Sequence, residues 1–87
     1  MDDWIAEHAS QRGHWPGLTV EQVKTIIGEV RANHQDAFDF GDGRRIFRKG
    51  DTILIEDGKG GGTMFRPSPQ SASAYFTQFI ELELRWI

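Results

Sequence analysis

The chain has 87 residues, a formal net charge of −3 and no cysteine. This length fits one domain, and the lack of cysteine excludes disulfides and thiolate metal sites. No apolar run approaches the roughly 20 residues that span a bilayer, and the acidic N-terminus lacks the apolar core of a signal peptide. We therefore expect a single domain over residues 1–87, with a helical part at 1–34, an antiparallel sheet at 36–87 and no membrane anchor.

The charges are unevenly distributed along the chain. Residues 1–42 carry eight acidic and three basic side chains, whereas residues 43–66 carry six basic and three acidic ones. Such an asymmetry says more about binding than the net charge does. An anionic ligand is expected to meet the second segment, although the negative charge of the whole chain counts against nucleic acid.

Two helices are predicted in the N-terminal part. The first spans residues 2–11, behind an aspartate cap. The second begins after Thr19, which stands three residues before Gln22 in the spacing of a capping box. It should end near residue 33, and its apolar stripe consists of Val20, Val23, Ile26, Ile27 and Val30.

Closely spaced runs of β-forming residues follow, separated by turns of glycine and aspartate. Such runs are typical of an antiparallel meander. The predicted strands cover residues 37–40, 44–48, 52–56 and 62–66. The expected fold class is α+β, with N-terminal helices packed on one face of a curved antiparallel sheet of four to five strands. The other face of the sheet is expected to be open.

The C-terminal segment is predicted as a short helix at residues 71–79 followed by a last strand at 80–86. The strand is predicted because apolar and charged residues alternate strictly over this segment. The side chains that would point inward are those of Ile80, Leu82, Leu84 and Trp86. A helix that continues through this stretch is the alternative.

Two histidines and an arginine lie within seven residues, in His8-Ala9-Ser10-Gln11-Arg12-Gly13-His14. Histidine titrates near neutral pH, so His8 and His14 are candidates for the general base and acid of a proton transfer. The structural alternative is that His8 packs beside Trp4 and that His14 is a solvated turn residue. A metal site from both histidines and a sheet carboxylate is less favoured, because no standard Cys/His spacing is present. No cofactor is expected, and His34 is expected to interact with the dipole of the second helix.

The glycine triplet Gly60-Gly61-Gly62 leads into the strand Thr63-Met64-Phe65-Arg66. It is not a P-loop, since neither the GxxxxGK[ST] pattern nor a following helix is present. The missing side chains would let a phosphate backbone approach, with Thr63 and Arg66 as hydrogen-bond donors beside it. A flexible hairpin loop is the alternative. Alternation places Thr63 and Arg66 on opposite faces, so a shared site needs a bulge or a strand end.

Further basic residues are candidates for contacts to the substrate's phosphate groups. They are Arg12, Arg44, Arg48 and Lys59. The period of two places Arg44 and Arg48 on one side of their strand and Phe47 on the other, where we expect it in the core. A solvated edge strand, whose charges prevent aggregation, is the alternative.

The order of these motifs resembles the C-terminal nuclease domains of bacterial polymorphic toxins, which include contact-dependent growth-inhibition toxins and colicin-type tRNases. Their barnase/EndoU/colicin/RelE (BECR) fold packs N-terminal helices on a curved four-stranded antiparallel sheet. The resemblance covers about residues 5–79, and its most specific part is Gly61-Gly62-Thr63-Met64-Phe65-Arg66-Pro67. By position, His8 matches the helical histidine that is often catalytic in such domains. Thr63 and Arg66 match polar residues of the last strand, and Arg12 and His14 match less closely.

The resemblance implies a metal-independent endoribonuclease toxin of bacterial competition, often one that cleaves tRNA and leaves a 2′,3′-cyclic phosphate. It also implies action in the bacterial cytoplasm, either after delivery as part of a larger toxin or as a free-standing toxin of a toxin–antitoxin pair, and neutralisation by a cognate immunity protein or antitoxin. Two features depart from the family: the acidic balance of the chain, and a tail at residues 81–87 that runs past the usual end.

On this hypothesis His8 and His14 transfer protons, and Thr63 and Arg66 position and stabilise the phosphate. His8→Ala is accordingly expected to abolish RNA cleavage. The alternative is a non-enzymatic α+β interaction module, such as an antitoxin, an immunity protein or a phage accessory protein, that uses the open sheet face. A third interpretation is a metal-dependent DNase.

Overall fold

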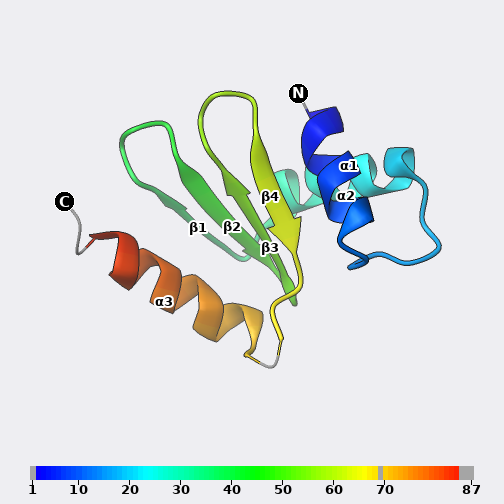
Figure 1. Cartoon of the computed structure of the whole chain (residues 1–87). Coiled ribbons are helices and arrows are strands. Elements are labelled where there is room, and N and C mark those ends of the chain that lie inside the picture. The colour runs from blue at the N-terminus through cyan, green and yellow to red at the C-terminus, as the bar shows by residue number, and fades with distance from the viewer. Residues whose placement is uncertain (1, 69, 85–87) are drawn as a thin grey trace.

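The computed structural model describes residues 2–68 and 70–84. Its elements follow in the order α1 (Asp2–Gln11), α2 (Val20–Asn33), β1 (Asp36–Asp39), β2 (Arg45–Lys49), β3 (Thr52–Glu56), β4 (Gly62–Phe65) and α3 (Ala72–Leu84). The strands form one antiparallel meander in the order β1-β2-β3-β4 (Figure 1). The predicted α+β class, with N-terminal helices on an antiparallel sheet, is confirmed.

Local sequence signals account for both ends of α2. The hydroxyl of Thr19 accepts a hydrogen bond from Gln22 N at 3.1 Å, and Gln22 Oε1 accepts one from Thr19 N at 2.8 Å. This is the predicted capping box. At the other end, Nδ1 of His34 lies 3.1 Å from the carbonyl oxygen of Arg31, so this histidine does interact with the helix C-terminus.

Alternation along the strands gives the sheet two covered faces. On the face beneath α1 and α2, three residues in register across the sheet are buried: Phe47, Leu54 and Met64. The helical side of this core consists of Ile5, Ala6, Ala9, Trp15, Val23, Ile27 and Val30. The prediction that Phe47 lies in the core is confirmed.

The opposite face is covered by α3, so the expectation of an open sheet face is wrong. Ile46 and Ile53 have no exposed surface there, and Ala72 of α3 is buried against them. Partly buried side chains complete this second core: Phe38, Phe40, Ile55, Phe65, Tyr75, Phe76, Phe79 and Ile80. Figure 1 shows the result as three layers, with α3 on one side of the sheet and α1 and α2 on the other.

The predicted C-terminal strand is wrong as far as residue 84, where the alternative of a continuing helix is confirmed. Steps of three and one residue, which are helical spacing, separate Ala72, Tyr75, Phe76, Phe79 and Ile80. The side chains of Leu82 and Leu84 point outward instead of inward, with 54% and 46% of their surface exposed. The remainder of the predicted strand, with Trp86, lies outside the described residues.

Gly62 has no room for a side chain, because the neighbouring strand occupies that space. A Cβ on Gly62 would lie 2.2 Å from the backbone oxygen of Ile55. The loop before it is filled by Asp57, whose carboxylate accepts hydrogen bonds from the N–H groups of Lys59 at 2.7 Å and Gly61 at 3.1 Å. These backbone bonds lower the pKa of Asp57. Gly62 thus serves the close pairing of β4 with β3, whereas Gly58, Gly60 and Gly61 line a depression of about 320 Å³ together with Arg31 and Arg45. A phosphate contact at this hairpin stays a prediction.

Arg31 joins α2 to α1 and to β3. Its guanidinium donates to both carboxylate oxygens of Asp2, at 3.1 and 2.9 Å, and its Nε donates to Glu56 Oε2 at 3.0 Å. The hydrogen bond from Arg31 lowers the pKa of Asp2. The three side chains are only partly exposed, so water screens their charges less than it screens a surface pair.

Gly62→Ala is expected to destabilise the protein by about 2 kcal/mol or more, because the added methyl group would clash with a backbone oxygen of the paired strand β3. Gly28→Ala is the matched control. It adds the same methyl group in α2, where nothing lies within 4 Å, and should stabilise the protein by about 0.5–1 kcal/mol. Urea unfolding measures both changes. A Gly62→Ala variant as stable as the wild type would contradict the packing described for this hairpin.

Arg31→Met is expected to lower the free energy of unfolding by about 1–2 kcal/mol at neutral pH. Because the pKa of Asp2 is lowered from its ordinary value of 3.8, this stabilisation is present above that value and is lost as the pH falls through the lowered pKa. The difference between variant and wild type should therefore shrink between about pH 4 and pH 2. Arg45→Met is the control, since Arg45 is 57% exposed and pairs with an exposed Asp39. Unfolding curves across this range would refute the account if the difference did not change with pH.

Candidate functional site

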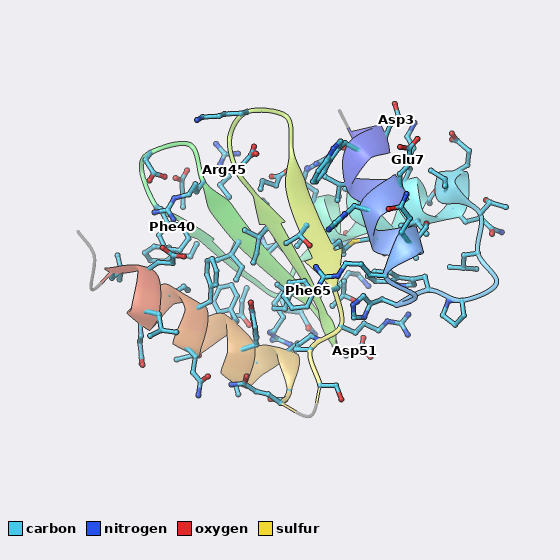
Figure 2. The ribbon with its side chains drawn as sticks, in the orientation of Figure 1. Asp3, Glu7, Phe40, Arg45, Asp51 and Phe65 are labelled. Atoms are coloured by element: carbon cyan, nitrogen blue, oxygen red, sulfur yellow. The ribbon has the colours of Figure 1, made fainter. Side chains whose placement is uncertain are left out.

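Two adjoining depressions lie where the end of β4 meets the α1–α2 connection and the first half of α3. The His14 depression, of about 340 Å³, is lined in part by Arg12, His14, Phe65, Arg66 and Tyr75. The α3 depression, of about 430 Å³, is lined by Arg12, Ile55, Thr63, Phe65, Tyr75 and Phe79. Arg12, Phe65 and Tyr75 border both, and Figure 2 labels Phe65 between the end of β4 and α3.

His14 is positioned by the main chain that follows β4. The backbone N–H of Arg66 donates to Nδ1 of His14 across 3.4 Å, so the neutral ring in this arrangement carries its proton on Nε2. The ring also lies near Trp15 and Phe65, with centroids 5.9 and 6.3 Å away. His14 is partly buried, and it is held beside Arg66 as a shared site requires.

The two arginines of the His14 depression are available to an anion. Arg66 lies over the indole of the buried Trp15, with its guanidinium carbon 5.1 Å from the ring centroid. A cation–π contact of this kind positions a guanidinium without neutralising its charge. None of the ion pairs between described residues includes Arg12 or Arg66. The depression therefore concentrates positive charge.

Thr63 lies on the other side of Phe65, in the α3 depression. Its Oγ1 is buried and has no hydrogen-bond partner among the described residues. A buried hydroxyl without a hydrogen bond costs about 1–3 kcal/mol of stability, so a ligand that supplied the missing hydrogen bond to Thr63 would be favoured. β4 ends at Phe65 and Arg66 follows it, but neither depression is lined by both Thr63 and Arg66, so the structure does not bring the two into one shared site.

Tyr75 is a site residue that the sequence analysis did not identify. Its ring meets Phe65 edge to face at a centroid distance of 5.0 Å, and it borders both depressions. Burial raises the pKa of Tyr75, so its hydroxyl stays protonated at neutral pH and can donate a hydrogen bond. Tyr75 lies in the helix predicted at residues 71–79, and its helical spacing with Ala72 and Phe79 was the signal that could have placed it against the sheet. It was missed because that face of the sheet was expected to be open.

His8 is stacked on Trp4, with ring centroids 5.1 Å apart and planes at 14°. This is the packing that the structural alternative expected. His8 precedes Arg12 by one helical turn, and its carbonyl oxygen accepts a hydrogen bond from Arg12 N. Its side chain borders neither depression, so the structure brings His14 but not His8 to Arg66, and neither histidine lines the depression of Thr63.

The other predicted phosphate contacts also lie elsewhere. Arg44 and Arg48 are held in ion pairs with neighbouring carboxylates. Lys59 belongs to the β3–β4 hairpin loop, at the opposite end of β4 from Arg66. Figure 2 shows Arg45 near that end of the sheet, away from Phe65. A substrate contact by Arg44, Arg48 or Lys59 stays a prediction.

Over residues 2–68 and 70–84, no group of three or more histidine, aspartate and glutamate side chains is arranged to hold a metal ion. In the same ranges, no helix has the length and apolar character needed to cross a membrane. Comparison with known proteins found no family model, no curated protein and no solved structure that matches the chain. A functional interpretation therefore depends on the geometry of the two depressions.

Proposed function

We propose that the chain is a metal-independent endoribonuclease toxin that cuts RNA in the His14 depression. The observation that carries the proposal is a positioned histidine beside two arginines that lack carboxylate partners among the described residues: His14, Arg12 and Arg66. RNA cleavage by the substrate's own 2′-hydroxyl needs a proton acceptor, a proton donor and cations that stabilise the charge of the phosphorane. The depression contains a group of each type.

Arg12 and Arg66 bind the scissile phosphate in this proposal, since a guanidinium matches two phosphate oxygens at once. Nδ1 of His14 accepts the proton of the 2′-hydroxyl after its contact with the backbone N–H of Arg66 is released. This release costs little free energy, because 3.4 Å exceeds the usual hydrogen-bond length. The 2′-oxygen then bonds to phosphorus, and the 5′-oxygen leaves with a proton from Tyr75. The product is a 2′,3′-cyclic phosphate. His8, one turn before Arg12, is a secondary candidate for proton transfer.

The biological setting comes from the family resemblance of residues 61–67 rather than from the site. It includes tRNA as the substrate, a cognate immunity protein or antitoxin as the partner, and delivery into the bacterial cytoplasm. The chain has the layout expected from that resemblance, two N-terminal helices and a four-stranded antiparallel sheet, to which α3 is added. The alternative of an interaction module that uses an open sheet face has lost its expected surface, because α3 covers it.

Incubation of the protein with total tRNA in EDTA tests the proposal. Discrete products ending in a 2′,3′-cyclic phosphate are expected, and His14→Ala should lower the cleavage rate by about 10²- to 10⁴-fold. His34→Ala is the matched control, since His34 lies at the end of α2 and outside both depressions. His8→Ala separates the two histidines, because the geometry predicts a smaller loss there than for His14→Ala.

Two results would contradict the proposal. Intact tRNA at high concentrations of folded protein would exclude ribonuclease activity toward this substrate. Cleavage that appears only after divalent ions are added would indicate a metal-dependent nuclease instead.

A further inference from the structure

We infer that the α3 depression is a pocket for one unpaired nucleobase, the base next to the scissile phosphate. The inference deepens the proposed ribonuclease function and rests on it. The depression has a volume of about 430 Å³ and adjoins the cationic His14 depression. Its lining combines apolar walls with a few hydrogen-bonding groups, which is the usual composition of a site for a small organic ligand.

Aromatic side chains from two layers of the fold form the walls of this pocket. Phe65 comes from β4, whereas Tyr75 and Phe79 come from α3. Phe65 and Tyr75 meet edge to face with their planes at 82°, and Tyr75 and Phe79 stack with centroids 6.1 Å apart. Rings of this kind stack on a base of any sequence, because every base has a π-face. The walls therefore favour a planar, uncharged ligand.

Thr63 supplies the group that would read the edge of the base. Its buried Oγ1 has no partner among the described residues, and a hydroxyl both donates and accepts a hydrogen bond. Rotation of the Thr63 side chain about its Cα–Cβ bond would turn this hydroxyl from its buried position into the pocket, where an amide, amine or carbonyl group of a base can complete the bond. A base that presents no such group at this position leaves Thr63 unpaired and is bound more weakly. Thr63 is thus a specificity residue in this inference, rather than the phosphate ligand expected from the sequence.

The distribution of charge around the two depressions favours a nucleotide over other classes of ligand. Arg12, His14 and Arg66 line the His14 depression, and no carboxylate is among the described residues that line either depression. An anionic group is favoured in the first depression and a neutral ring in the second. Arg12 borders both and stands where the phosphate and the base of one nucleotide would meet. A base inside a duplex is stacked and paired, so the bound nucleotide must be unpaired or extruded.

Thr63→Val tests the inference, because it replaces the hydroxyl by a methyl group of similar size. Calorimetry would measure the binding of the four nucleoside 3′-monophosphates, with inorganic phosphate as the reference probe. At least one nucleotide is expected to bind more tightly than phosphate, and Thr63→Val should weaken that nucleotide by about 10-fold while leaving phosphate binding unchanged. Thr63→Ser keeps the hydroxyl and should keep the preference. Thr77→Val is the control, since Thr77 is exposed on α3 and its hydroxyl donates to Ser73 O.

The outcomes distinguish this inference from the proposed function. If tRNA is cleaved but Thr63→Val changes neither nucleotide affinity nor the base at the cut site, the base pocket is overturned and the ribonuclease stands. If nucleotides bind in a manner that depends on Thr63 but no RNA is cleaved, the pocket stands and the ribonuclease is overturned. Equal affinities of the wild type for all four nucleotides and for phosphate would overturn the pocket outright.

Discussion

The burial of β3 on both of its faces is the constraint on which the structure depends. Ile53 and Leu54 are adjacent, point to opposite sides of the sheet and have no exposed surface. A small sheet with two apolar faces needs a helical layer on each side. α1 and α2 form one layer and α3 forms the other (Figure 1). α1 ends just before His14, and α3 begins a few residues after Arg66. Each helical layer therefore has a helix end beside the end of β4, where the candidate site lies.

The contacts that stabilise this junction also give the two depressions their different chemistry. Trp15 is buried in the core beneath α1 and α2, and its ring supports Arg66 while His14 lies at its edge. The cationic groups are therefore fixed from the N-terminal layer. The aromatic walls come from β4 and α3, and β4 also carries Thr63, whose buried hydroxyl has no partner among the described residues. A cationic depression and a more apolar one adjoin because two cores meet at the end of one edge strand.

The structural features that depend on signals within a few residues were predicted well from the sequence. The features that depend on packing between distant segments were not. The capping box of Thr19 and the period of two in the meander are local, so α2 and all four strands were found within about one residue at each end. Residues 80–84 alternate as a strand does, but Ile80 also continues the helical stripe of α3 and packs in the core with Ile46 and Ile53, a contact that the sequence does not reveal. Tyr75 was within the helix predicted at residues 71–79, but its place at the site depends on the packing of that helix on the sheet. Gly62 was interpreted as an approach for phosphate because the backbone of Ile55, which occupies its space, is invisible in the sequence.

The central claim is that the anion-binding surface lies at the junction of β4 and α3, and not at the glycine hairpin. Amide chemical-shift mapping with a short 2′-O-methyl RNA, which the protein cannot cleave by the proposed reaction, tests this claim most directly. The account predicts that the largest changes occur at Arg12, His14, Arg66 and Tyr75, with little change over residues 57–61. Changes centred on residues 57–61, or binding that leaves His14 and Tyr75 unaffected, would contradict it.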